Sequence, residues 1–190
     1  MNQHSTLVYP EHYTEQIRKV ELVGEAFFEV ARDTSKPFVI EAGDVLIEVL
    51  GTSFNVEAFA DRDSILVYVE TGKVRLSHQG NAVTLTPGMQ GVYDKNTGLM
   101  NIVFDSDENT DAWRDHKLVF KRTKLSRVIK TINELYATNI EIGSEAIANC
   151  KLSVRFDDES LDNILDIIVS TLNLELTKVD SKITLDGDGC

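Results

Sequence analysis

The side chains that could carry catalysis or bind a metal ion are few and scattered in this sequence. None of the histidines stands at ligand spacing from a second histidine or a cysteine, and no HExxH motif is present. The chain also has no GxSxG motif, no phosphate-binding P-loop and no GxGxxG pattern after a predicted strand. We therefore predict no catalytic, metal-binding or cofactor-binding residues, and expect that the protein is not an enzyme. The histidines are His4, His12, His78 and His116.

Residues 105–111 form an acidic stretch that begins like a calcium-binding EF-hand loop, with acidic or amide side chains at the first three ligand positions. The pattern then fails, because Thr110 occupies the position that requires glycine and His116 the position that requires glutamate. We interpret this stretch as a linker. A second acidic stretch, residues 186–189, is interpreted as a flexible tail.

The two cysteines, Cys150 and Cys190, make neither a metal-binding motif nor a disulfide framework. Cys150 lies beside an apolar strand, where we expect it to act as a small buried hydrophobic side chain. Cys190 ends the chain, and we expect it to fray. A Cys150–Cys190 disulfide is the alternative, and the distance between the two Cα atoms would decide the matter.

The composition is that of a soluble globular protein. The 190 residues suit one large domain or two small ones, and 42% of them are hydrophobic and 26% charged. A net charge of −12 disfavours nucleic acids and anionic membrane surfaces as partners. No stretch reaches the roughly 18–20 apolar residues of a membrane helix, and no signal peptide is visible. We expect a soluble chain that can be a piece of a larger protein.

Residues 16–104 have the pattern of short β-strands. Segments rich in Val, Ile, Phe and Leu are separated by turn-forming clusters such as Pro87-Gly88. Val74 and Leu76 alternate with polar residues, which is typical of a half-buried strand. Strands spaced by about 8–12 residues predict an all-β sandwich or barrel-like domain. The predicted strands are residues 20–23, 27–31, 38–41, 45–50, 54–59, 65–70, 73–77 and 82–85.

Beyond residue 111 the hydrophobic period becomes helical. Apolar residues fall on one helix face in residues 125–136 and again in residues 161–172. Ser160 is a candidate N-cap for the second helix. A shift of 36 residues superposes the apolar positions of the two halves. We predict a small α+β domain of two βαβ-like repeats, closed by a strand at residues 182–185.

A cluster of basic residues surrounds the start of the first predicted helix. We interpret it as the solvated face of that helix and its approach. Two alternatives stay open, an electrostatic patch that steers an acidic partner and internal pairing with the acidic residues in 157–166. The cluster comprises Arg114, Lys117, Lys121, Arg122, Lys124, Arg127 and Lys130.

The change of pattern sets the predicted domain boundaries. We expect an all-β domain at residues 7–104, a linker at 105–111 and an α+β domain at 112–190. Trp113 stands at this boundary, and we expect it to pack the two domains together, with an interface hot spot as the alternative.

Several ordered motifs resemble those of the FecR family of anti-sigma factors. The resemblance covers about residues 16–186, and its C-terminal part is similar to that of Bacteroidetes-like members. The motifs are RKVELVGEAFFEV at 18–30, PFV at 37–39, VLGTSFNV at 49–56, GKV at 72–74, LTPG at 85–88, and then Trp113, LVF at 118–120, Leu125 and Tyr136.

These motifs indicate a fold and not a reaction site. Gly24 and Gly51 stand where one strand gives way to the next, positions that often require positive φ or a close backbone approach. Phe27, Phe28 and Phe54 are candidates for the hydrophobic core.

The resemblance implies a role in cell-surface signalling and transcription regulation. FecR-like proteins span the inner membrane of Gram-negative bacteria. Their cytoplasmic segment holds an extracytoplasmic-function sigma factor, and their periplasmic region senses the signalling domain of a TonB-dependent outer-membrane transporter. The C-terminal part resembles the secretin/TonB short N-terminal fold. Because the sigma-binding segment and the membrane helix are absent here, we expect a periplasmic receiver that touches neither membrane nor sigma factor.

We expect the transporter's signalling domain to bind the C-terminal strands by adding to an exposed sheet edge. The alternative is a periplasmic β-sandwich that binds a ligand or polysaccharide, although such sites usually display exposed aromatic residues. The predicted partner-binding residues are Leu174, Leu176, Lys182, Ile183 and Leu185.

Overall fold

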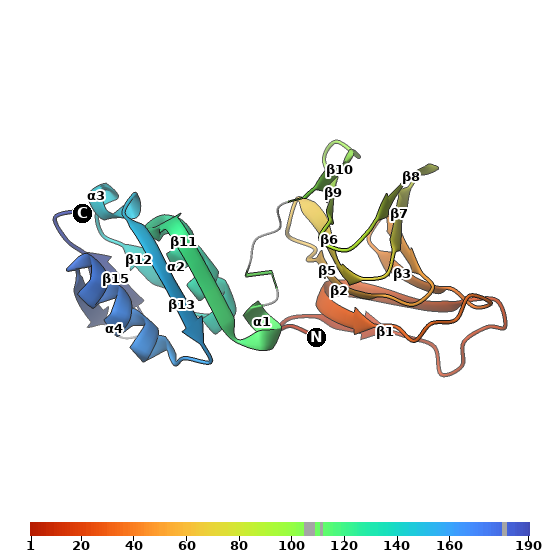
Figure 1. Cartoon of the computed structure of the whole chain (residues 1–190), viewed down its shortest axis with the longest axis horizontal. Helices are drawn as coiled ribbons and strands as arrows, with labels where there is room; N and C mark the ends of the chain where they lie inside the picture. Colours follow the sequence, from red (N-terminus) through yellow and green to blue (C-terminus); the bar gives the residue numbers. More distant parts are fainter. Residues whose placement is uncertain (105–108, 111, 180–181) are drawn as a thin grey trace. The chain divides into compact units, whose positions relative to one another are not determined.

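The structure, a computed structural model, describes residues 1–104, 109–110, 112–179 and 182–190. The chain forms two compact units, Met1–Ser106 and Asp107–Cys190, and each is described by itself. Figure 1 shows strands throughout the first unit and both helices and strands in the second. Most of the predicted linker, residues 105–108 and 111, lies outside the described residues.

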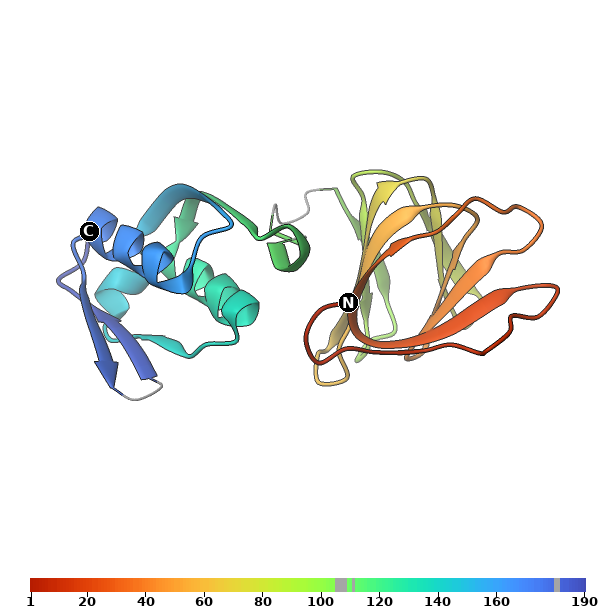
Figure 2. The same cartoon turned by 90° about the horizontal axis from the view of Figure 1, so that it is seen from below.

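In the described part of the first unit, ten strands form one curled, barrel-like sheet (Figures 1 and 2). The order is β10-β9-β6-β5-β2-β3-β4-β7-β8, with β1 paired to β2. Strands β2 and β3 run parallel, and the other neighbours run antiparallel. The all-β prediction is confirmed. The strands are β1 (Thr6–Val8), β2 (Arg18–Glu29), β3 (Phe38–Ala42), β4 (Val45–Val49), β5 (Ser53–Ala58), β6 (Ser64–Thr71), β7 (Val74–His78), β8 (Asn81–Leu85), β9 (Gln90–Asp94) and β10 (Met100–Val103).

Strand β2 changes partners at Gly24, which lets one strand serve both sides of the curled sheet. Its first half pairs with β3 and β1, and its second half, from Gly24 onward, pairs with β5. Gly24 has a φ of 102°, and a Cβ there would lie 2.6 Å from the Cα of Ser5. Only glycine meets both conditions without strain. The two strands predicted at residues 20–23 and 27–31 are therefore one strand with a glycine at its turning point.

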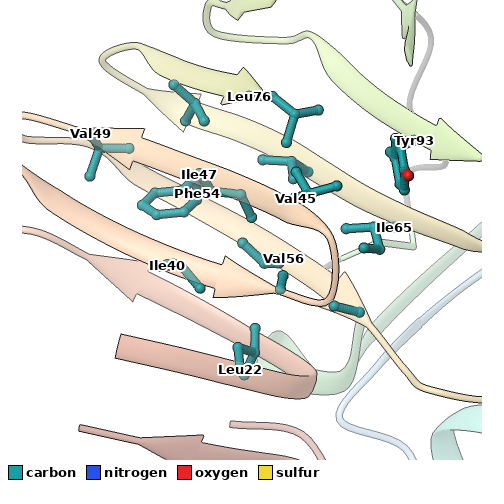
Figure 3. Close-up of a cluster of buried hydrophobic side chains, with 14 of the residues drawn as sticks. Leu22, Ile40, Val45, Ile47, Val49, Phe54, Val56, Ile65, Leu76 and Tyr93 are labelled. Carbon is teal, nitrogen blue, oxygen red and sulfur yellow. The ribbon is translucent and has the colours of Figure 1, made fainter. Parts of the chain in front are cut away.

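The core of the first unit is built by alternation along its strands. In β4, Val45, Ile47 and Val49 are buried, whereas Leu46 is exposed. Figure 3 shows the three buried residues of β4 together with buried side chains from other strands of the sheet.

The phenylalanines of the motifs differ in burial. Phe54 is fully buried, as predicted, and its ring stacks on that of Phe28 with centroids 5.4 Å apart. Phe27 and Phe28 are only partly buried, because both lie in the second half of β2 near its exposed end. Phe28 packs at the margin of the core and not within it.

His78 on β7 contacts Tyr93 on β9, although these strands are not neighbours in the sheet. The Tyr93 hydroxyl lies 3.2 Å from His78 Nε2, and His78 Nδ1 lies 2.8 Å from the carbonyl oxygen of Asp44. A carbonyl can only accept, so Nδ1 carries the proton and Nε2 accepts from the tyrosine. This histidine therefore helps to close the curled sheet.

In the described part of the second unit, two sheets enclose two helices. The ribbon β11–β13 is antiparallel, and the three-stranded sheet has the order β12-β15-β14. Helix α2 contacts strands of both sheets, and Figure 2 shows α2 and α4 between them. The elements are α1 (Ala112–Asp115), β11 (Lys117–Lys124), α2 (Leu125–Tyr136), β12 (Ile140–Ile142), α3 (Glu145–Ala148), β13 (Lys151–Asp157), α4 (Leu161–Leu172), β14 (Glu175–Val179) and β15 (Lys182–Asp186).

The backbone bears out the 36-residue repeat. Arg122 and Asp158, 36 residues apart, both have positive φ, at 51° and 53°. Ala137 and Asn173, also 36 apart, both end their helices in the left-handed conformation, at 49° and 51°. The repeat thus includes the turns as well as the apolar positions.

The N-cap prediction for α4 is confirmed. The backbone N–H of Asn163 donates to Ser160 Oγ at 3.3 Å, which satisfies one of the helix's unpaired donors. The short helices α1 and α3 have four residues each, too few to show a helical period in the sequence.

Cys150 and Cys190 form a disulfide, with their Cα atoms 5.7 Å apart. Cys150 is buried, as expected, but its thiol is not free, and the expectation that Cys190 frays is wrong. The acidic segment before Cys190 folds back along the unit, and the hydroxyl of Ser144 donates to the carbonyl oxygen of Gly187 at 3.3 Å. Sequence spacing could not reveal this bridge, because it is the fold that brings the segment after β15 beside the residue before β13.

Candidate functional site

The five predicted partner-binding residues lie in or beside the three-stranded sheet, but they do not share a surface. Leu174, Ile183 and Leu185 are buried in the core of the second unit. Leu176 is partly buried and packs against that core, and Lys182 is exposed. Only Leu176 and Lys182 can therefore contribute to a surface as the unit stands.

Strand β15 lies in the centre of its sheet and offers no open edge. It pairs with β12 on one side and β14 on the other. The N–H of Ile183 donates to the carbonyl oxygen of Asn139 at 3.3 Å. The expectation that residues 182–185 form an exposed edge is wrong, and the partner role of these residues stays a prediction.

Strand β14 is one of the two edge strands of that sheet, and β12 is the other. One side pairs with β15, and no described strand pairs with the other. Lys178 bonds Asp162 of α4 at 2.5 Å, and Val179 is 61% exposed. Charged residues on an edge strand oppose uncontrolled strand addition. Lys178 therefore makes indiscriminate pairing along the open edge of β14 less favourable.

The predicted basic cluster lies mainly on a strand. Lys117, Lys121, Arg122 and Lys124 belong to β11. Of the other three members, Arg127 and Lys130 lie on α2 and Arg114 on α1. The interpretation as the solvated face of the helix and its approach therefore fits, and the approach is the strand β11 of the ribbon β11–β13.

A buried carboxylate in the first unit was not anticipated from the sequence. Glu25 is 6% exposed, and its two oxygens accept from Asn2 Nδ2 at 2.6 Å and Asn55 Nδ2 at 2.7 Å. Burial raises the pKa of Glu25, while the hydrogen bonds from Asn2 and Asn55 lower it. Strand alternation would place Glu25 outward, but residues at the N-terminus cover it: its N–H donates to Ser5 Oγ at 2.8 Å.

The described residues hold no cluster of three or more histidine, cysteine or acidic side chains arranged for a metal ion. None of the described helices is long and apolar enough to cross a membrane.

Comparison with known proteins supports a regulatory assignment. The FecR protein family model matches residues 1–75, and the FecR, C-terminal model matches residues 117–185. A crystal structure of a candidate anti-sigma factor from Parabacteroides distasonis is 31% identical, with a TM-score of 0.75 over 97% of this chain and 87% of that chain. A second crystal structure of the same description is 30% identical, with a TM-score of 0.75 over 100% and 89%. No curated protein matches the chain.

A curled all-β unit followed by an α+β unit with unpaired strand edges, together with this likeness over nearly the whole chain, defines a signalling regulator of the anti-sigma class. The two family models match in the expected order, one within each unit. The chain belongs to the FecR family of anti-sigma factors.

Proposed function

We propose that this chain is the signal-receiving periplasmic region of its anti-sigma factor. It binds the N-terminal signalling domain of a TonB-dependent outer-membrane transporter and thereby controls an extracytoplasmic-function sigma factor. The sigma factor itself is held by a cytoplasmic segment outside this region. No catalytic step is part of this role.

One observation carries the proposal. The region matched by the FecR, C-terminal model, residues 117–185, falls within a separate compact unit. That unit has strand edges without a partner strand among the described residues, at β14 and on the ribbon β11–β13. Strand addition to such an edge supplies affinity through the main chain and specificity through alternate side chains.

The disulfide supports a periplasmic location. Disulfides persist in oxidising compartments such as the bacterial periplasm and are rare in the cytosol. Cys150 and Cys190 are bonded in the unit that we propose as the receiver. The disulfide that stabilises the receiver would therefore form in the periplasm, the compartment in which the transporter's signalling domain is found.

Isothermal titration calorimetry tests the proposal. The oxidised chain is titrated with the signalling domain of the transporter encoded beside it, and saturable binding is expected. The signalling domain of an unrelated transporter serves as the control. If both proteins are folded and no heat of binding is seen, the receiver role is contradicted while the family membership stands.

A further inference from the structure

The ribbon β11–β13 has one apolar face and one charged face. Leu118 and Phe120 of β11 are buried, and so are Leu152 and Phe156 of β13, in the same core cluster as the buried residues of α2 and α4. Successive side chains of a strand point to opposite faces. The outer face therefore carries the alternate residues, which are Lys117, Val119, Lys121, Lys151, Ser153, Arg155 and Asp157.

The outer face is strongly basic in an acidic chain. The two strands hold six basic residues and one acidic residue, Asp157, while the chain as a whole has a net charge of −12. Lys124 and Lys151 stand directly opposite each other in the register. Like charges in that position destabilise a sheet, so folding alone does not account for them.

A bulge adds a further basic residue to the ribbon. The register shifts between Phe120 and Thr123, and Arg122 adopts a φ of 51°, which costs energy for a residue other than glycine. The N–H of Arg122 donates to Ser153 Oγ at 2.8 Å. The bulge therefore interrupts regular pairing on the β11 side while keeping an exposed arginine there.

The outer edge of β11 is already occupied at Val119. The N–H of Val119 donates to Asn109 Oδ1 at 2.7 Å, and its carbonyl oxygen accepts from Asn109 Nδ2 at 3.0 Å. The side-chain amide of Asn109 thus takes the place of a neighbouring strand. Together with the bulge, this amide blocks strand addition along β11.

The hydrogen bonds between Asn109 and Val119 also show in which direction the backbone N–H and carbonyl groups of β13 point. Because Val119 directs its N–H and carbonyl away from β13, the pair Val119–Arg155 is a non-hydrogen-bonded pair of the antiparallel ladder. The N–H and carbonyl of Arg155 must then point to the outer edge of β13. No described strand pairs with that edge.

We propose that the outer edge of β13 accepts an extended segment of a partner protein whose side chains alternate between acidic and apolar. Acidic residues would lie beside Lys151 and Arg155 on the outer face, where opposite charges across strands stabilise a sheet. Apolar residues would lie on the inner face beside Val154. This residue is half-buried, and the residues before and after it on the same face, Leu152 and Phe156, are buried. An anionic membrane is disfavoured, because acidic residues 157–159 follow at the end of the strand.

The partner that binds this edge need not be the transporter, so synthetic peptides serve as the probe in the binding experiment. The oxidised full chain is titrated with a synthetic peptide that alternates Glu and Val, and with a control peptide that alternates Lys and Val. Binding of the Glu-Val peptide, weaker at high salt and absent for the Lys-Val peptide, is expected. Equal binding of both peptides, binding of neither, or binding to anionic vesicles in place of the peptide overturns the proposal.

Two sets of variants separate charge from edge pairing. Lys151→Glu with Arg155→Glu should weaken Glu-Val peptide binding at least about tenfold, whereas Lys130→Glu with Arg127→Glu, the same charge change on helix α2, should weaken it less. Arg155→Pro should bind more weakly than Arg155→Ala, because both lose the charge but only proline loses the edge N–H. Circular dichroism confirms that each variant is folded. Unchanged affinity in the first pair, or equal affinity of the two Arg155 variants, contradicts strand addition at β13.

Discussion

Cys150 and Cys190 are joined by a disulfide across a sequence separation of 40 residues, with Cα atoms 5.7 Å apart. The bridge ties the segment that follows β15 to the residue that precedes β13. Because β13 and β15 belong to the two different sheets of the second unit, the bond joins chain segments that lead from one sheet and into the other. The receiver that we propose is therefore held together by a bond that depends on its compartment.

Removing this bond should destabilise the second unit. The variant Cys150→Ala with Cys190→Ala is expected to lose about 2–4 kcal/mol of unfolding free energy, because an open chain regains conformational freedom when it unfolds. Urea denaturation followed by the fluorescence of Trp113 measures the effect. Reductant should shift the wild-type transition in the same direction and leave the variant unchanged. Equal midpoints for oxidised wild type and variant would contradict a stabilising bridge.

The buried Glu25 should make stability depend on pH. Burial raises its pKa in the folded state above the value in the unfolded chain. The stabilising contribution is then fully present below the unfolded pKa and is lost as the pH rises through the folded pKa. The unfolding free energy of the wild type, relative to Glu25→Gln, should therefore fall as the pH is raised from the acidic range toward neutrality.

The measurement is urea denaturation of both proteins across that pH range, followed by far-ultraviolet circular dichroism. Glu29→Gln, which removes a carboxylate from an exposed position of the same strand, is the matched control. A constant difference between wild type and Glu25→Gln would show that Glu25 does not titrate differently on folding.

Gly24 should tolerate a side chain less well than Gly98. Both have positive φ, 102° and 70°, but a Cβ at Gly24 would lie 2.6 Å from the Cα of Ser5 whereas nothing lies within 4 Å of one at Gly98. Gly24→Ala should therefore cost about 1–3 kcal/mol more than Gly98→Ala, through overpacking and strain. Thermal unfolding of the two variants compares their stabilities directly. Equal losses of stability would mean that the backbone at Ser5 moves aside for the added methyl group without a cost in free energy.

Truncation of Phe54 should be the severest of the motif phenylalanine changes. Phe54 is fully buried, whereas Phe28 is partly buried at the margin of the core. We expect Phe54→Ala to cost about 3–5 kcal/mol and Phe28→Ala less. Chemical denaturation followed by circular dichroism gives both values, and a larger loss for Phe28→Ala would contradict the core assignment.

Hydrophobic period alone identified most of the fold. Alternation gave β3 to β8, and the helical period with its 36-residue repeat gave α2, α4 and their strands. Strand β9 was missed because Gly91 interrupts its pattern. That glycine is required by the tertiary structure, since a Cβ there would lie 2.8 Å from Leu85 and 3.0 Å from Leu76. Local propensity does not show such a contact across the sheet.

The candidate site was less predictable, because it depends on which strands become neighbours. The pattern around Ile183 correctly indicated a strand, but nothing in it shows that β15 pairs on both sides. The same holds for the outer edge of β13, whose availability follows from the bonds between Asn109 and Val119. The disulfide likewise results from the tertiary arrangement and not from cysteine spacing.

The most direct test of the receiver role is a map of where the transporter's signalling domain binds. Isotope-labelled chain is titrated with the unlabelled signalling domain, and the shifts of the backbone amide resonances are recorded. The account predicts saturable shifts in the second unit, within residues 112–190, with the amides of the first unit little changed. Shifts confined to residues 1–104, or no shifts with both proteins folded, would contradict it.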